Sequence, residues 1–249
     1  MKLSYFIILI AGASIALTAC KKNTFHVTER DIITNTALIK IGYFSPSIKN
    51  QGIQLKINGN RVSNNFVYPI AFPGGGLNTG GSNNSDYVTV TPGETTISLS
   101  VPKVGTAEDS VPVLTFSQSL TANKKYTFFT TDSVPNVSGV IVEDDTQAVD
   151  TAARIKLINL IPNVAAVDFY HRGVLLKANV KYKEVTEYIT IPNGNDVWAI
   201  RRAGAPITEA VLGTQTINTV RQRIYTFLAR GWQGGTGTLN PRISAIFVQ

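Results

Sequence analysis

The sequence contains one pattern twice, in tandem. Five segments of the first half recur in the second half in the same order, with similar alternation of apolar and polar residues. The matching segments are 37–46 with 153–162, 54–59 with 168–173, 87–93 with 188–194, 126–128 with 225–227, and 140–142 with 245–248. One such match arises easily by chance, but five in the same order indicate an internal duplication. The chain is therefore expected to fold as two related units.

Each copy has the sequence pattern of a β-sandwich. About seven runs of five to eight residues rich in Val, Ile, Thr and aromatic residues are separated by Gly, Pro, Asn and Ser. Only 16% of the residues are charged, 43% are apolar, and no window shows sustained helical periodicity. We predict an all-β protein with two tandem immunoglobulin-like or fibronectin-like β-sandwich domains. These are repeat 1 (37–145) and repeat 2 (153–249), joined by a linker at 146–152.

Two local features support this prediction. Alternating residues before Asn58-Gly59 are typical of a hairpin. Leu120 lies six residues before Tyr126, which is typical of a tyrosine corner, where the tyrosine hydroxyl hydrogen-bonds backbone across the end of the sandwich. Ile217 precedes Tyr225 by eight residues, so repeat 2 departs from that spacing. Two ordinary core tyrosines on equivalent strands are the alternative.

Both repeats resemble a known bacterial family, the domain of unknown function 4397, and repeat 2 resembles it more closely. The matching segments are Ile161-Pro162, Val167-Asp168-Phe169-Tyr170, Arg172-Gly173 and Ile224-Tyr225-Thr226 in repeat 2, and Ser45-Pro46, Asn58-Gly59 and Tyr126-Thr127 in repeat 1. Arg172 replaces the usual asparagine and the usual glycine before Tyr225 is missing, so we expect these turns to differ. The resemblance implies an exported, often lipid-anchored protein and supplies no activity or catalytic residues.

The N-terminus has the layout of a secretory signal. Lys2 supplies a positive charge, an apolar run follows at 5–17, and small residues precede Cys20, the only cysteine. The run is too short to argue for a stable membrane span. Leu17–Cys20 resembles the bacterial lipoprotein signal, in which a peptidase cuts before the cysteine and the new N-terminus receives acyl chains such as palmitate. An ordinary secretion signal cleaved at an upstream alanine is the alternative.

On this prediction, residues 1–19 are the signal peptide, and residues 20–36 comprise the lipidated Cys20 and a polar, aperiodic tether. Several acyl chains hold a protein durably, so the membrane is a predicted partner. A modified Cys20 leaves no thiol for an internal disulfide. Lys21-Lys22-Asn23 lacks the acidic residues of a surface-export tag, which favours the periplasmic side of the outer membrane over the cell surface.

Residues that support catalysis or metal binding are few. The two histidines are His26, in the tether, and His171, near a strand end, and a zinc site lacks thiol ligands. A Ser-His-Asp arrangement would have to use His171 with Asp168, but positions 168 and 171 of a strand face opposite sides. No phosphate-binding or dinucleotide-binding motif occurs. The sequence predicts no catalytic residues, no metal and no cofactor.

Two segments have residues that could bind an ion, and the sequence does not decide whether they do. The Gly- and Asn-rich insertion at 72–85 has backbone amides that could hold an anion, although a long flexible loop is the simpler interpretation. Glu143, Asp144, Asp145 and Asp150 could bind calcium, although a solvated linker between the copies is again simpler.

Trp232 lies in the glycine-rich segment 230–235, where an exposed indole could stack on a sugar or anchor a protein partner. Covering one end of the sandwich is the alternative. Trp198 lies in an alternating run, and we expect it in the core.

Charge is concentrated in repeat 2, where 12 Lys and Arg face 5 Asp and Glu. Much of the excess comes from Lys177, Lys181, Lys183, Arg201, Arg202, Arg221 and Arg223. Such a domain attracts anionic lipids, acidic glycans or an acidic protein, unless the cations merely solvate the surface. Nucleic acid is not expected, because no nucleic-acid-binding motif accompanies the charge.

These features favour a non-catalytic cell-envelope lipoprotein whose tandem domains bind an envelope protein or a glycan at the outer membrane. The predicted contacts are Trp232, Arg201, Arg202, Arg221 and Arg223. The alternative is a glycan-processing enzyme with a loop-built active site, in which two carboxylates lie within about 10 Å of each other.

Overall fold

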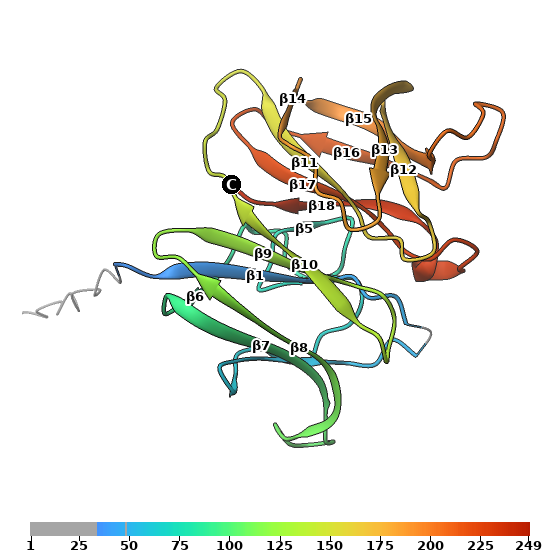
Figure 1. The fold of residues 1–249 in the computed structure, drawn as a ribbon. Coiled ribbons are helices and arrows are strands. Elements are labelled where there is room, and N and C mark those ends of the chain that lie inside the picture. The colour runs from blue at the N-terminus through green and yellow to red at the C-terminus, as the bar shows by residue number, and fades with distance from the viewer. Residues whose placement is uncertain (1–33, 48) are drawn as a thin grey trace, which may run out of the picture. The chain divides into compact units, whose positions relative to one another are not determined.

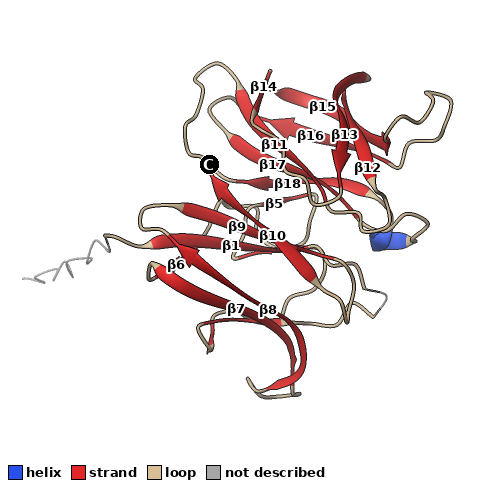
Figure 2. Cartoon of the chain, viewed as in Figure 1, coloured by secondary structure: helices blue, strands red, loops and turns tan. Residues whose placement is uncertain are grey.

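The structure is a computed structural model that describes residues 34–47 and 49–249, so the predicted signal peptide and Cys20 lie outside the described residues. Strands dominate the described chain (Figure 2). Repeat 1 contains β1 (Ala37–Tyr43), β2 (Gln54–Ile57), β3 (Asn60–Arg61), β4 (Ile70–Phe72), β5 (Gly76–Leu77), β6 (Val88–Val90), β7 (Gly93–Pro102), β8 (Asp109–Leu120), β9 (Lys125–Thr131) and β10 (Ser138–Asp144). Within residues 34–249, no helix is both long and apolar enough to cross a membrane.

Repeat 2 contains the remaining strands and a short 3-10 helix. They are β11 (Ala153–Asn159), β12 (Ala166–His171), β13 (Val174–Lys181), β14 (Ile189–Ile191), β15 (Gly194–Arg202), β16 (Gly213–Thr219), β17 (Ile224–Arg230), η1 (Gly237–Leu239) and β18 (Arg242–Phe247). Between β10 and β11 the chain has no strand over 145–152, the stretch that includes the predicted linker.

Both repeats are built from two sheets, as expected for the predicted β-sandwich class. In repeat 1 the sheets have the orders β10-β9-β1-β4, with β6 also paired to β1, and β3-β2-β7-β8. In repeat 2 the orders are β14-β11-β17-β18-β5 and β13-β12-β15-β16 (Figure 1). The duplication is visible in the pairing, because the first strand of each repeat runs parallel to the tyrosine-bearing strand. Ile39 lies opposite Tyr126 in repeat 1, and Ile155 lies opposite Tyr225 in repeat 2.

The predicted hairpin turn at Asn58-Gly59 is present and connects β2 to β3. Asn58 and Gly59 have φ angles of 49° and 80°. In the corresponding turn of repeat 2, Arg172 and Gly173 also have positive φ angles, of 53° and 78°. Two consecutive positive φ angles are typical of the hairpin turn whose twist matches the strands. The Arg172-Gly173 turn therefore has the same backbone conformation as the Asn58-Gly59 turn of repeat 1. The backbone of Arg172 adopts the left-handed conformation, which is uncommon for a residue other than glycine, and its guanidinium pairs with Asp196 at 2.8 Å.

The central strands are buried on both faces. Ile39 and Ile41 of β1 point into the core of repeat 1, whereas Lys40, between them, is also fully buried and hydrogen-bonds repeat 2. From repeat 2, Ile158 and Leu228 join the core cluster of repeat 1. A strand covered on both faces has a nearly continuous apolar sequence instead of strict alternation. The two repeats thus share an apolar interface.

The insertion at 72–85 is part of that interface, so the flexible-loop interpretation is wrong. β4 pairs with β1 of its own repeat, whereas β5 pairs with β18 of repeat 2, with Leu77 opposite Ala245. The N–H of Phe247 donates to the carbonyl of Gly75 at 2.7 Å, and the Ser85 hydroxyl donates to the carbonyl of Val248 at 2.7 Å. Residues 34–249 form one compact unit for this reason.

Candidate functional site

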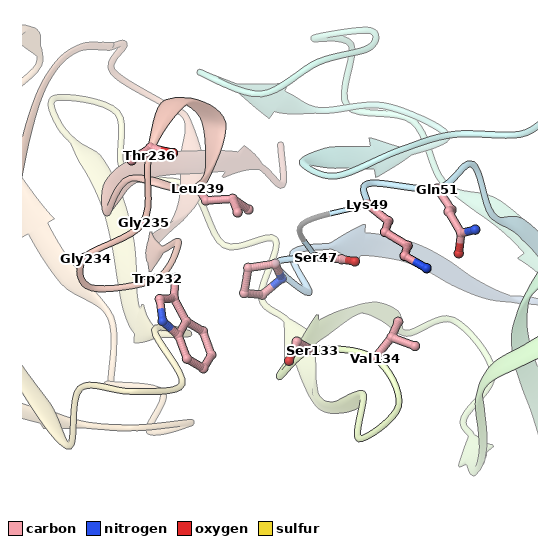
Figure 3. A pocket seen from close by; sticks show the side chains of 11 residues that line it. Ser47, Lys49, Gln51, Ser133, Val134, Trp232, Gly234, Gly235, Thr236 and Leu239 are labelled. Carbon is pink, nitrogen blue, oxygen red and sulfur yellow. The ribbon is translucent and has the colours of Figure 1, made fainter.

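A groove of about 790 Å³ lies between loops of the two repeats, with Trp232 on one side (Figure 3). In the same view, Lys49 and Gln51 of repeat 1 lie on the other side. The groove is lined by Pro46, Ser47, Lys49, Gln51, Ser133, Val134, Trp232, Gly234, Gly235, Thr236 and Leu239.

The loop that presents Trp232 is tightly closed by its own backbone. The N–H of Trp232 donates to the carbonyl of Leu239, and the N–H of Gly235 donates to the carbonyl of Trp232, both at 2.8 Å. A Cβ atom on Gly231 would lie 2.6 Å from the carbonyl oxygen of Asn240, and Gly231 also has a φ of 113°. The glycines are therefore required for the chain to turn this sharply after β17.

The same loop is fixed to the rest of repeat 2. The amide group of Asn163 donates to the carbonyl of Gln233 and accepts the N–H of Gln233, both at 2.9 Å. Trp232 itself is 38% exposed, so its ring is only partly covered by neighbouring atoms. A rigid loop that leaves a large apolar ring open to solvent is suited to contact with another molecule.

The opposite side of the groove is tied to repeat 2 through the turn between β9 and β10. Asp132, next to Ser133, accepts the hydroxyl of Tyr182 at 2.5 Å and lies 3.2 Å from the ammonium of Lys183. Burial tends to raise the pKa of Asp132, but its hydrogen bonds with Ser138, Tyr182 and Lys183 outweigh that effect and lower it. An ionised Asp132 thus holds the two sides of the groove at a defined spacing.

The groove combines an apolar surface with hydrogen-bonding groups. Trp232, Pro46, Val134 and Leu239 contribute the apolar part, whereas the polar part comes from hydroxyl, amide and ammonium groups. Sites for small polar molecules have this mixture, in which a few polar groups set the orientation of the ligand. None of the described residues that line the groove carries a carboxylate.

The four predicted basic contacts do not form one patch. Arg201 and Arg202 end β15, whereas Arg221 and Arg223 follow β16 beside Thr219, which pairs with the first residue of β15. At about 3.3 Å per residue, the length of β15 places the two pairs roughly 25 Å apart. Neither pair lines the Trp232 groove, where Lys49 is the cation among the described lining residues.

Three of these arginines already have partners within repeat 2. Arg202 forms an ion pair with Glu209 at 2.8 Å, and Arg201 donates to the backbone carbonyl of Glu209. The guanidinium of Arg223 lies 4.6 Å from the ring centroid of Phe247. The side chains therefore contribute to local packing as well as to the surface charge.

Asp168 and His171 face opposite sides of β12, as predicted. Asp168 accepts the backbone N–H groups of Asn179 and Gly204 at 2.7 and 3.1 Å. His171 lies 2.9 Å from Asp196, and its ring stacks on the fully buried Trp198 at 4.3 Å. The prediction that Trp198 lies in the core is confirmed. The pairing with Asp196 was missed, because it joins neighbouring strands and has no signal in the local sequence.

The acidic run is also placed differently from the expectation. Glu143 and Asp144 lie in β10, and Asp144 is buried, so the solvated-linker interpretation is wrong for it. Asp144 accepts the hydroxyls of Thr127 and Tyr87 at 2.6 and 3.1 Å, and burial raises its pKa. Glu143 pairs with Lys124, and Asp145 pairs with Arg154. Each of these carboxylates therefore interacts with different partners. No cluster of three or more potential metal ligands occurs in the described part of the chain.

Comparison with known families and structures gives one informative match. The family model described as "Domain of unknown function (DUF4397)" matches two overlapping segments, residues 37–170 and 153–243, as expected for a domain present in two copies. No curated protein matches this chain.

Two solved structures align with the chain over more than three quarters of its length. One comes from a study titled "Alpha-glucan recognition by family 41 carbohydrate-binding modules from streptococcal virulence factors", with 10% identity and a TM-score of 0.25 over 83% of this chain and 96% of that chain. The other is a leucine-rich repeat protein from Bacteroides thetaiotaomicron, with 16% identity and a TM-score of 0.19 over 77% of this chain and 25% of that chain. Likenesses this distant carry no argument about ligands.

Proposed function

From the premise that this chain belongs to the family of the domain of unknown function 4397, which it contains in two copies, we propose that it is a non-catalytic lipoprotein of the cell envelope. Its two β-sandwich domains jointly form a groove, and the ligand of this groove is a glycan. The observation that carries the proposal is the partly exposed indole of Trp232 on a loop held by backbone hydrogen bonds.

The groove suits a sugar because it offers both kinds of contact that a sugar ring needs. The C–H face of a pyranose packs on an aromatic ring, and Trp232 provides such a ring at the edge of the groove. The hydroxyl groups of the sugar require donors and acceptors, which Ser47, Gln51, Ser133 and Thr236 supply around the same space. A protein partner that inserts a side chain against Trp232 is the other occupant that the experiment distinguishes.

Binding without catalysis is favoured by the chemistry of the lining. Glycoside hydrolysis in most families uses two carboxyl groups about 5–10 Å apart, one of them as a general acid. The lining residues that the structure describes around Trp232 supply hydroxyls, amides and one ammonium group, but no carboxylate. Such a lining can hold and orient a glycan, and it lacks the acid that would cleave one.

The envelope location is proposed from the N-terminal sequence. A lipid-modified Cys20 would attach the chain to the outer membrane, on its periplasmic side. Mass spectrometry of the native protein should show a diacylated or triacylated N-terminal cysteine. Protease treatment of intact cells should leave the protein uncut if the periplasmic orientation is right, and detection of Cys20 as a free thiol would contradict the anchor.

Glycan binding can be tested by the intrinsic fluorescence of the full chain, titrated with a panel of neutral and acidic polysaccharides. Trp198 is fully buried, so a ligand-induced change reports on Trp232. We expect Trp232→Ala to weaken binding at least tenfold, as detected by retardation in polysaccharide gels, and Trp232→Phe to keep part of it.

A matched control is Val174→Ala, because Val174 is 69% exposed on β13 and is not part of the groove. This variant should bind like the wild type. If no polysaccharide binds, but a protein from envelope extracts binds in a Trp232-dependent manner, the ligand is a protein and not a glycan. Polysaccharide binding that is equal in wild type and Trp232→Ala would exclude the groove.

A further inference from the structure

Two arginines of repeat 2 lie directly opposite each other in the β17–β18 pair. The register places Arg230, the last residue of β17, across from Arg242, the first residue of β18. The side chains of such a pair start only about 5 Å apart, and like charges in this position are destabilising. A negative charge close to both side chains would remove this repulsion.

Arg230 is also buried, with 3% of its surface exposed. Its guanidinium donates to the hydroxyl of Ser244 at 2.7 Å, to the hydroxyl of Tyr68 at 3.0 Å and to the carbonyl of Asn78 at 2.9 Å. All three acceptors are neutral. Within the described residues, neither Arg230 nor Arg242 forms an ion pair with a carboxylate. A buried charge is normally paired, so Arg230 is an exception.

The donor capacity of the two side chains is not used up. A guanidinium has five N–H groups, so the three bonds of Arg230 leave two N–H groups over. Arg242 is exposed, and its guanidinium makes one long contact, to the carbonyl of Gly237 at 3.5 Å. Both arginines line a cavity of about 380 Å³ together with Thr79, Gln215 and Thr238, which carry further hydrogen-bonding groups.

We propose that this cavity is an oxyanion site, in which Arg230 and Arg242 together bind a carboxylate, sulfate or phosphate group. Two guanidinium groups on one anion replace the repulsion between the strands by two charge-assisted interactions. The site shares no lining residue with the Trp232 groove, so it is independent of the proposed glycan function. Its anion could be a free inorganic ion or the acidic group of a sugar.

The duplication provides an internal comparison. In repeat 1, the residues in the corresponding register are Thr131 and Ser138, which also face each other across the strand pair. Two hydroxyl-bearing residues occupy this position without any charge, so the fold itself does not require the arginine pair. Repeat 2 has two cations at a position where the other copy has none.

The test measures the thermal midpoint of the full chain in sodium sulfate and in sodium chloride at matched ionic strength. Separate samples contain glucuronate, with glucose as the uncharged control. If the anion is present at about one hundred times its dissociation constant, the midpoint of the wild type should rise by about 5 °C. Sulfate also stabilises proteins generally because it is excluded from their surface, so the anion-specific rise is the excess over the rise of Arg242→Gln. An anion-specific rise with sulfate alone indicates a free inorganic ion, whereas one with glucuronate and not with glucose indicates the acidic group of a sugar.

Arg242→Gln is the decisive variant, because Arg242 is exposed and its loss should not impair folding. At low ionic strength it should melt at or above the wild-type temperature, since the repulsion is gone. Its midpoint should show only the general effect of the salt and no anion-specific rise. The double variant Arg230→Thr/Arg242→Ser, which installs the residues of repeat 1, should likewise lose the anion-specific rise. Its midpoint should lie below that of the wild type, because Ser244, Tyr68 and Asn78 lose their buried donor. Arg221→Gln is the control and should respond like the wild type. No anion-specific rise in the wild type, or an equal rise in Arg242→Gln, would overturn the proposal.

Discussion

Thr127 and Thr226 occupy the same position in the two repeats, but only Thr127 has a hydrogen-bond partner for its hydroxyl. Thr127 donates to Asp144 at 2.6 Å, whereas the hydroxyl of Thr226 is buried and has no partner among the described residues. The pairing of each threonine strand with the next one explains the difference. Thr127 lies opposite Val142 and Thr226 opposite Ile246, so the residue two positions further on is Asp144 in repeat 1 and Val248 in repeat 2.

Replacement of Thr226 by valine should stabilise the protein. Valine has nearly the same shape and removes a buried hydroxyl that makes no bond, so the free energy of unfolding should rise by about 1 kcal/mol. The matched change Thr127→Val should instead lower it by about 2 kcal/mol, because Asp144 loses a donor while it stays buried. Urea unfolding of both variants measures the two values. Equal effects in both repeats would contradict the assigned difference.

The stability of the protein should rise with pH above pH 8 because of Lys40. Burial lowers the pKa of Lys40 to about 8, and the carboxylate of Asp144 only partly offsets this effect. An unfolded lysine titrates near pH 10.5, so between pH 8 and pH 10.5 the unfolded state binds more protons than the folded state. The cost of a buried ammonium is therefore present in full below pH 8 and is relieved as the pH rises.

Lys40→Met removes this dependence while it keeps the length of the side chain. Relative to this variant, the wild type should gain about 2 kcal/mol of unfolding free energy between pH 7 and pH 9.5. The measurement stays below pH 10, where tyrosines of the unfolded chain begin to ionise. Denaturant unfolding at several pH values gives the difference, and parallel curves for wild type and variant would show that Lys40 is not the source.

Both repeats should depend on their tyrosine corners. The hydroxyl of Tyr126 accepts the N–H of Thr121 at 3.2 Å, and the hydroxyl of Tyr225 accepts the N–H of Val220 at the same distance. Tyr126→Phe and Tyr225→Phe should each lower the unfolding free energy by about 1 kcal/mol or somewhat more, since each leaves a backbone N–H without its acceptor. Thermal melts should show comparable losses. If Tyr225→Phe melted at the wild-type temperature, the second tyrosine corner would not contribute to stability.

Charge reversal of the surface arginines should act in two independent steps. Because Arg201 and Arg202 lie far from Arg221 and Arg223, reversal of either pair should reduce retention on an anionic resin only partly, and the two effects should add. Elution salt concentration measures each step. Loss of all retention on reversal of one pair would indicate a single patch, in conflict with the strand register.

The β-sandwich class and the duplication could be predicted from the sequence because both depend on local patterns. The alternation around Ile39 and Ile41, the turn at Asn58-Gly59 and the Tyr-Thr-Phe strands each span only a few residues. Each is found at the expected place in the fold. The tyrosine corner at Tyr225 looks irregular in the sequence, because Ile217 precedes the tyrosine by eight residues and not by six. The structure shows that the spacing from tyrosine to backbone N–H, five residues in both repeats, is the relevant quantity.

The remaining features depend on which surfaces meet, and the sequence does not encode that in a local pattern. Lys40 in an apolar strand looks like a solvent-facing residue until the second repeat covers it. Arg230 at the end of a strand looks like an ordinary surface cation, but repeat 1 covers it with Tyr68 and with Asn78 of the insertion. The partner of His171 is 25 residues away, on another strand.

The strand that repeat 1 contributes to the sheet of repeat 2 changes how the gene can evolve. Tandem copies usually remain exchangeable, because each carries everything that its own fold requires. Here β5 extends the sheet of its neighbour next to β18, so deletion of the first copy would leave the second with an open sheet edge and an uncovered hydrophobic side. Recombination that multiplies or removes single copies should be selected against, and the pair is expected to be inherited as one indivisible unit.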